Sequence, residues 1–207
     1  MEKEILDQAF DARFPKEMKE KLENAHVAIA GLGGLGSNIA LMLARSGVGH
    51  LLLVDFDVVD VTNLNRQAYG ISQVGKEKTQ ALKELLCEIN PYLEYECKCV
   101  RVTPENVKEL FTGYPIVCEA FDKAEQKAML VQELLTQFSE TVVISGNGMA
   151  GFGDANEIQT KKMMRCLYVC GDQKTDIAEG IGLMAPRVAI CAAHQANKVL
   201  QIILEEE

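Results

Sequence analysis

Short apolar runs alternate with amphipathic stretches along most of the chain. Apolar runs expected to be strands lie at residues 26–30, 51–55, 115–120 and 141–145, and residues 92–102 alternate as a further strand. Between and after them, apolar residues recur at helical spacing over residues 37–46, 74–89, 105–111, 123–138 and 185–205. Several strand candidates are apolar throughout, as expected when helices cover both faces of a sheet. The alternation predicts an α/β fold with a Rossmann-like, doubly wound, mostly parallel sheet and right-handed crossovers.

Two segments depart from this alternation. Residues 1–24 are charged with periodic apolar positions, which predicts an N-terminal helical extension of one or two short helices broken near Pro15. Residues 146–184 are rich in glycine and polar residues and are expected to form an irregular crossover loop with short extended pieces at 152–159 and 163–169. A loop of this length is usually functional or disordered. With no internal repeat, residues 1–207 are expected to form a single domain.

The composition narrows the classes of function. The 207 residues carry a net charge of −9, and 48% are hydrophobic, as in ordinary globular proteins. Lysines and arginines form no basic stripe, so nucleic acid is not the expected partner. The start lacks a secretory signal, and no apolar stretch approaches the ~20 residues of a membrane span. We therefore expect a cytoplasmic enzyme without a membrane partner.

Seven cysteines without a secretory signal are expected to be reduced thiols. Cys97 and Cys99 form one close pair, and Cys166 and Cys170 another, but neither pair has the CxxC spacing. Structural zinc normally takes four ligands in two close pairs. Buried structural thiols are the favoured interpretation, and zinc is expected to be absent.

A glycine loop follows the first strand. The segment 31–36 reads Gly-Leu-Gly-Gly-Leu-Gly, and a helix is predicted from Ser37. Gly31 allows a tight turn, Gly33 a close approach to phosphate, and Gly36 close packing of helix on strand. The helix N-terminus stabilises an anion, and Asp55 at the end of the next strand can bind ribose hydroxyls. The loop predicts a nucleotide site that would suit NAD or ATP. It is not a Walker A loop, because no lysine follows the last glycine.

Residues further along the chain separate these two nucleotides. Asp55-Phe-Asp57 is followed by Asn63-Leu-Asn-Arg66-Gln67, then by Val74-Gly75-Lys-Glu-Lys78, and by Asp122 after the fourth strand. This order of motifs, GxGGLG, DxD, NLxRQ, VGxxK and a late aspartate, resembles the ThiF/MoeB family, the bacterial relatives of ubiquitin-activating enzymes. The similarity extends from about residue 24 to residue 125.

The resemblance implies an adenylyltransferase that uses ATP and Mg²⁺ to activate the C-terminal glycine carboxylate of a ubiquitin-like sulfur carrier ending in Gly-Gly. It implies a homodimer and a separate sulfur donor. The compact outline is closest to the short ThiF group, whose carrier is ThiS-like and serves thiamine thiazole synthesis. The residues implied to bind nucleotide are Gly31, Gly33, Gly34, Gly36, Asp55, Asp57, Asn63 and Gln67, and those implied to be catalytic are Arg66, Lys78, Asp122 and Arg13.

The chemistry supports these roles independently. Adenylation builds charge on phosphate oxygens, so Arg66 and Lys78 would act as cations and Asp122 would hold Mg²⁺. Arg13 is the candidate for the arginine that family members extend to the nucleotide of the partner subunit. Taken singly, Arg66 suits a surface ion pair, Asn63 and Asp122 suit helix caps, and Lys76 competes with Lys78 as the phosphate ligand.

Departures from the family pattern leave alternatives open. The CxxC pairs of longer members are missing, no domain is appended, and residues 175–186 contain no cysteine, although Cys170 lies just before them. Buried thiol is the favoured interpretation of Cys170 over a thiol in a mobile loop. The rival functions are activation of a molybdopterin-type carrier, adenylation of a small molecule or a modified tRNA base, NAD-dependent oxidoreduction, and non-catalytic nucleotide binding.

Overall fold

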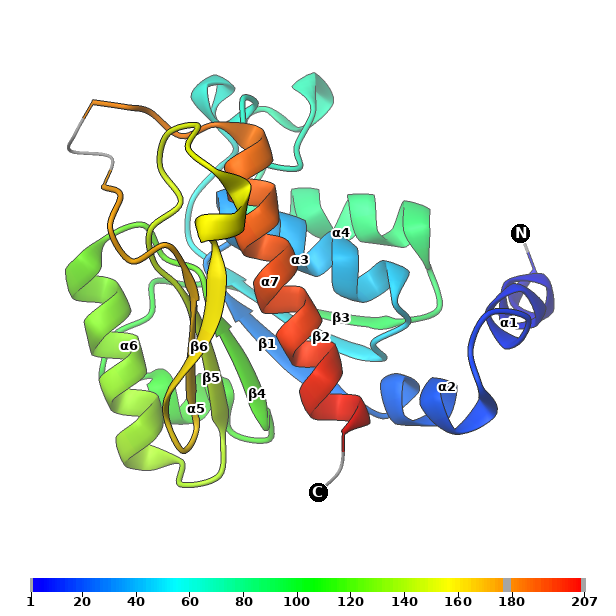
Figure 1. Ribbon diagram of the computed structural model, residues 1–207. Coiled ribbons are helices and arrows are strands. Elements are labelled where there is room, and N and C mark those ends of the chain that lie inside the picture. Colours follow the sequence, from blue (N-terminus) through cyan, green and yellow to red (C-terminus); the bar gives the residue numbers. More distant parts are fainter. Residues whose placement is uncertain (1, 177–179, 206–207) are drawn as a thin grey trace.

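A seven-stranded sheet forms the centre of the computed structural model, which describes residues 2–176 and 180–205 (Figure 1). Its strand order is β3-β2-β1-β4-β5-β7-β6. All neighbouring strands are parallel except β6 and β7. The strands are β1 (His26–Ala30), β2 (His50–Asp55), β3 (Glu94–Cys99), β4 (Ile116–Glu119), β5 (Val142–Gly146), β6 (Gln159–Met164) and β7 (Leu167–Gly171).

Helices cover both faces of the sheet, as the apolar strands predict. One face packs against α3 (Gly34–Arg45), α4 (Lys78–Ile89) and α7 (Ala185–Leu204), and the other against α5 (Val107–Phe111) and α6 (Ala124–Gln137). Along β1, Val27 and Ile29 join the first core, whereas Ala28 and Ala30 join the second. Successive side chains of a strand point to opposite faces, so a strand between two helical layers must be apolar at every position. The predicted α/β architecture is confirmed.

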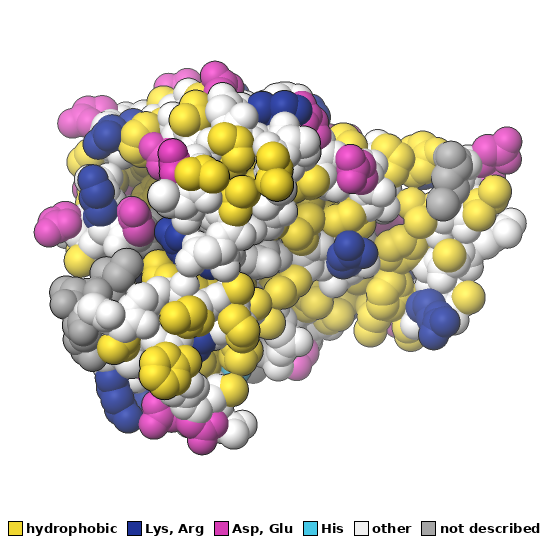
Figure 2. Space-filling view, turned by 90° about the horizontal axis from the view of Figure 1, so that it is seen from above, with side chains coloured by type: hydrophobic (Ala, Val, Ile, Leu, Met, Phe, Trp, Pro, Cys, Tyr) yellow, Lys and Arg dark blue, Asp and Glu magenta, His cyan; other side chains and the backbone are white. Residues whose placement is uncertain are grey.

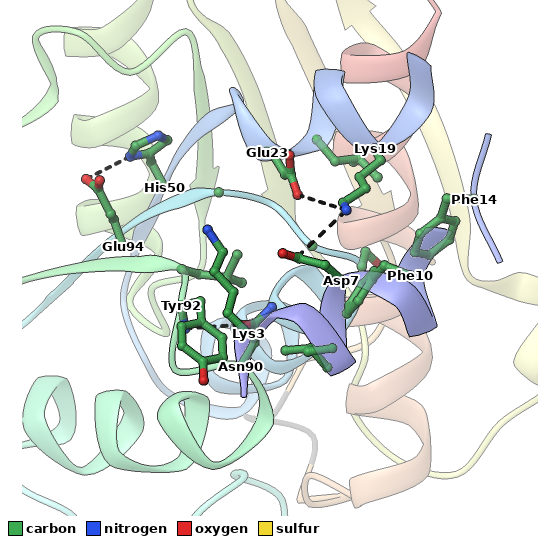
Figure 3. Close-up of a pocket in the computed structure, with 16 residues that line it drawn as sticks. Lys3, Asp7, Phe10, Phe14, Lys19, Glu23, His50, Asn90, Tyr92 and Glu94 are labelled. Atoms are coloured by element: carbon green, nitrogen blue, oxygen red, sulfur yellow. Dashed lines mark hydrogen bonds and ion pairs between the residues drawn. The ribbon is translucent and has the colours of Figure 1, made fainter. Parts of the chain in front are cut away.

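The N-terminal extension forms two helices, α1 (Lys3–Asp11) and α2 (Lys16–Glu23), on either side of Pro15 as predicted. Helix α2 packs against α7, whereas α1 projects from the body of the molecule (Figure 1). Between these helices and the starts of β2 and β3 lies a cavity of about 220 Å³, lined in part by Phe10, Lys19, His50 and Tyr92 (Figure 3). The extension therefore lies at the amino ends of the strands.

The segment 146–184 is more ordered than its sequence indicated. Residues 159–171 form the antiparallel β6–β7 hairpin, which extends the sheet. The extended piece expected at 163–169 overlaps this hairpin, whereas the prediction of irregular structure was wrong for the rest of it. Strand β6 is an edge strand, and five of its six residues are exposed. Edge strands of this kind lack the apolar alternation that identifies a strand in sequence. Within the described residues, no helix is long and apolar enough to span a membrane.

Candidate nucleotide site

The glycine loop joins β1 to α3 at the carboxyl edge of the sheet. A Cβ atom on Gly31, whose φ is +90°, would lie 2.8 Å from the Ala120 carbonyl oxygen. A Cβ atom on Gly36 would lie 1.8 Å from the carbonyl oxygen of Gly31. At Gly33, the N-cap of α3, the nearest atom would be Gln67 Nε2 at 3.8 Å. Backbone atoms therefore leave no room for a side chain at Gly31 and Gly36. The space beside Gly33 is open, and a phosphate can approach the helix N-terminus there.

Replacing Gly36 by alanine is expected to lower the free energy of unfolding by about 2 kcal/mol or more, because the added methyl group displaces backbone rather than a flexible side chain. The matched variant Gly33→Ala adds its methyl group to open space and should unfold near the wild-type temperature. Thermal unfolding of the two variants checks this difference. Equal melting temperatures would show that the loop relaxes freely.

Asp55 and Lys78 form the charged centre of the site. The Asp55 carboxylate accepts hydrogen bonds from the backbone N–H of Leu32 in the glycine loop at 2.7 Å and of Asp57 at 2.8 Å. Lys78 Nζ lies 3.0 Å from Asp57 Oδ2 and 4.0 Å from Asp55 Oδ2, with only 6% of the residue exposed. The Tyr69 hydroxyl donates to the Leu32 carbonyl oxygen at 2.9 Å, and burial raises the pKa of Tyr69 far above its usual value. A buried cation is thereby held beside the predicted ribose carboxylate.

The choice between Lys76 and Lys78 follows from where α4 begins. Residues 75–76 pair with Val59 through two backbone hydrogen bonds of 2.8 Å, so the helix starts at Lys78 rather than at residue 74 as predicted. The backbone N–H of Lys78 donates to the Asp57 carbonyl oxygen at 2.9 Å. Lys76 instead pairs with Glu84, and both side chains are exposed to solvent. The structure therefore places Lys78, and not Lys76, beside the glycine loop.

Arg66 lies over the start of α3. A Cβ atom on Gly34 would be 3.5 Å from Arg66 Cγ, and the guanidinium donates to the Thr62 carbonyl oxygen at 3.2 Å and to Asn65 Oδ1 at 2.8 Å. Neither contact is an ion pair. The charge of Arg66 is thus held at the helix N-terminus, where it can contact an anion.

Gln67 and Asn63 differ in whether their side-chain oxygens have a hydrogen-bond partner within the protein. Gln67 is 9% exposed, and its Oε1 has no hydrogen-bond partner among the described residues. A buried acceptor without a partner is costly unless a ligand supplies a donor. The Nε2 atom of the same amide would lie 3.8 Å from a Cβ atom on Gly33, so the Gln67 side chain adjoins the glycine loop. Asn63 Oδ1 accepts from the Asp60 backbone N–H at 3.0 Å, as the third residue of a capping box whose N-cap is Asp60. Asn63 thus ends a short 3-10 helix, Val61–Asn63, and the alternative in which Asn63 is itself a helix cap was wrong.

Asp122 and Arg13 occupy opposite ends of the molecule. Asp122 follows β4, beside the segment that packs on Gly31, and its exposed carboxylate has no hydrogen bond or ion pair among the described residues. It is free to bind a cation. Arg13 follows α1 at the amino ends of the strands, away from the glycine loop (Figure 1). Within one chain, Arg13 is therefore not brought to the site.

Two buried ionic clusters near this edge of the sheet were not identified from sequence. Asp172, just after β7, pairs with Arg187 in the first turn of α7 and accepts from the backbone N–H groups of Lys174 at 2.8 Å and Thr175 at 2.9 Å. Glu119, the last residue of β4, pairs with Lys127 of α6. A single charged residue at the end of an apolar run is the signal that was available for Glu119.

The thiols do not form a metal site. Cys170 lies in β7 rather than in a mobile loop and is fully buried. Burial raises the pKa of its thiol to about 11, although the contact with Thr160 acts in the opposite direction. In the described part of the chain, no group of three or more His, Cys, Asp or Glu side chains is arranged to hold a metal ion. A single carboxylate such as Asp122 can still hold Mg²⁺ together with phosphate oxygens.

In the folded protein at neutral pH, Cys170 is expected to resist alkylation while Cys99, which is exposed, reacts. Iodoacetamide labelling followed by peptide mass spectrometry measures both rates in one sample. Labelling of both thiols in denaturant is the control for reagent access. Similar native rates at the two positions would contradict the burial of Cys170.

The arrangement suits a nucleoside triphosphate. It offers an open helix N-terminus, a carboxylate for ribose, two cations and an unpartnered carboxylate within the segments that meet at the glycine loop. The unsatisfied Gln67 acceptor and the open Gly33 position are observations of the fold itself that fit a bound nucleotide.

Comparisons with known proteins find relatives over most of the chain. A family model described as the ThiF family matches residues 7–207. The tRNA threonylcarbamoyladenosine dehydratase of Bacillus subtilis is 40% identical over 146 residues, or 70% of this chain and 57% of that protein. The molybdopterin-synthase adenylyltransferase of Salmonella typhimurium is 29% identical over 195 residues, or 92% of this chain and 77% of that protein. The chain thus spans little more than half the length of the first of these relatives.

Among solved structures, the E. coli tRNA N6-threonylcarbamoyladenosine dehydratase in complex with ATP has a TM-score of 0.86 and 23% sequence identity to this chain. The match covers 95% of this chain and 93% of that one. At this identity the similarity establishes the fold.

Proposed function

The chain belongs to the ThiF family, and on that premise we propose that it is an ATP-dependent adenylyltransferase for the C-terminal carboxylate of a ubiquitin-like sulfur carrier. In this reaction a carboxylate oxygen forms a bond to the α-phosphorus of ATP. The bond from that phosphorus to the bridging oxygen breaks, and pyrophosphate leaves with the electron pair. The observation that carries the proposal is the buried Lys78 held between Asp55 and Asp57 beside the glycine loop.

Each side chain of the site has a role in this proposal. Asp55 accepts hydrogen bonds from ribose hydroxyls, and the α3 N-terminus with Arg66 and Lys78 stabilises charge on the phosphates. Asp122 and phosphate oxygens would hold Mg²⁺, which neutralises the departing pyrophosphate. Arg13 would act from the partner subunit of a homodimer, because the fold places it far from the site of its own chain.

The same residues argue against a nicotinamide dehydrogenase. NAD needs the glycine loop and Asp55, but hydride transfer gives no role to two cations and a free carboxylate around the phosphate position. Non-catalytic nucleotide binding would not need Arg66, Lys78 and Asp122 together.

The surface around the site supports a protein as the substrate. Seven large hydrophobic side chains are at least 41% exposed on segments at this edge of the sheet, namely Phe56, Val58, Val61, Ile71, Val74, Phe152 and Met184. Figure 2 looks down on this side of the molecule, and hydrophobic side chains gather on it. Exposed apolar patches of this kind mark protein–protein contact surfaces, whereas nucleic acid is bound by basic ones.

A second candidate is adenylation of a carboxylate on a modified tRNA base. It is favoured by the 40% identity to a relative named for a tRNA modification. The chemistry at phosphorus would be the same, and only the acceptor differs. The net charge of −9 and the apolar rim favour the protein acceptor.

Pyrophosphate–ATP exchange distinguishes these functions. The purified chain is mixed with labelled pyrophosphate, ATP and Mg²⁺, and with a ThiS-like carrier, a molybdopterin-type carrier, or tRNA whose modified base carries a free carboxylate. We expect exchange that requires a carrier with an intact Gly-Gly end, with the ThiS-like carrier of thiamine thiazole synthesis as the preferred one and sulfur supplied afterwards by a separate donor. Removal of the last glycine is the control. Exchange with tRNA and with neither carrier would establish the second candidate. If none of the acceptors supported exchange, both proposed functions would be contradicted.

A further inference from the structure

Glu119 is a charged residue in one of the least accessible places in the molecule. It ends β4, all four residues of which are buried, and none of its own surface is exposed. Both carboxylate oxygens are satisfied by three different segments. Lys127 Nζ of α6 lies 3.1 and 3.0 Å from Oε1 and Oε2, Ser145 of β5 donates to Oε2 at 2.5 Å, and the backbone N–H of Phe121 donates to Oε1 at 2.7 Å.

These contacts hold the short segment that leads to Asp122. The backbone N–H of Ala120 donates to the Ala30 carbonyl oxygen at 2.8 Å, which continues the β1–β4 pairing by one residue. A Cβ atom on Gly31 would lie 2.9 Å from Phe121 Cδ1, so the same segment packs on the glycine loop. Asp122 is the next residue, and no partner of its own fixes its carboxylate. Its position therefore depends on the backbone that Glu119 holds.

We propose that Glu119, with Lys127, is a positioning residue that aims Asp122 at the Mg²⁺ and phosphates of the bound nucleotide. The inference rests on the proposed function, since it assumes that Asp122 is the magnesium ligand. A purely apolar residue at position 119 would fill the same space but would leave the Phe121 N–H unpaired and the turn free to move. Glu119 also forms an ion pair with Lys127 of α6, which ties this segment to the helix that follows it.

The test is the gain in ATP affinity that Mg²⁺ produces, measured by calorimetry in Mg²⁺ and in EDTA. Glu119→Gln keeps the shape but loses the charge pair. We expect its affinity in EDTA to match the wild type, and the Mg²⁺-dependent gain to fall by about tenfold, as is common when support of a metal ligand is removed. The matched control is Glu125→Gln, an exposed carboxylate in the first turn of the same α6. An equal loss in EDTA and in Mg²⁺ would overturn the positioning role and indicate a structural one.

A second pair of variants keeps the test decisive if Glu119→Gln does not fold. Lys127→Arg retains the ion pair and should keep the Mg²⁺-dependent gain, whereas Lys127→Met should lose it. The same gain in both variants would overturn the proposal. Failure of the proposed function gives a different result, because the wild-type chain itself would then show no Mg²⁺-dependent binding of ATP.

Discussion

Replacing Asp122 by asparagine is expected to lower the rate of carrier-dependent pyrophosphate exchange by about a hundredfold or more, with little change in thermal stability. The exposed carboxylate has no hydrogen bond or ion pair among the described residues, so the fold loses nothing when its charge is removed. The reaction, as proposed, loses the carboxylate that would hold Mg²⁺ beside the glycine loop. A fall in rate without a fall in melting temperature therefore separates chemistry from folding.

The control for this prediction is Glu125→Gln, which removes an exposed carboxylate only three residues away. It should retain the wild-type exchange rate. If Asp122→Asn retained more than about a third of the wild-type rate at saturating Mg²⁺, another group would have to hold the metal, since a single electrostatic contact of this kind is typically worth two to three orders of magnitude.

The second large effect is expected at the buried pair of Asp172 and Arg187. Their side chains are 1% and 4% exposed, and Arg187 also donates to the Asp154 carbonyl oxygen at 2.8 Å. Together they join the loop after β5, the loop after β7 and the start of α7. Asp172→Asn leaves an uncompensated cation in the interior, which should lower the free energy of unfolding by about 3–5 kcal/mol in urea denaturation.

The matched control for this pair is Glu157→Gln. Glu157 lies 4.0 Å from the same guanidinium, but its side chain is 49% exposed, so its charge is largely screened and its loss should cost no more than about 1 kcal/mol. A double variant, Asp172→Leu with Arg187→Met, should recover much of the lost stability, because it removes both buried charges. Equal losses in Asp172→Asn and Glu157→Gln would contradict the importance of burial.

The pair also predicts how stability depends on pH. Burial acts to raise the pKa of Asp172, but the hydrogen bonds from the Thr175 and Lys174 N–H groups, the Thr175 hydroxyl and Arg187 outweigh it and lower the pKa from 3.8 to about 2. The folded state thus favours the ionised form more than the unfolded chain does. The contribution is present above pH 3.8 and is lost as the pH falls through about 2, and Asp172→Asn should lack this part of the acid transition.

The amino-acid sequence by itself determined the layered α/β architecture and the position of the nucleotide site. Strands buried on both faces are apolar at every position. The glycine loop requires its glycines, because a Cβ atom added at Gly36 would lie only 1.8 Å from the carbonyl oxygen of Gly31. These constraints are local, so the residues that satisfy them are neighbours in the sequence and can be recognised there. The motif from Asp55 to Lys78 belongs to the same class, although the residues alone left Lys76 as an alternative to the favoured Lys78.

Only the tertiary structure decided the remainder. The β6–β7 hairpin is stabilised by pairing at the sheet edge rather than by an apolar pattern, and Cys170 is buried because that hairpin and α7 enclose it. Lys78 was separated from Lys76 by the pairing of residues 75–76 with Val59. Glu119 with Lys127, and Asp172 with Arg187, are joined across 8 and 15 residues of sequence by the packing of separate elements. Such contacts depend on which elements become neighbours in space, and the spacing of residues along the chain does not predict this.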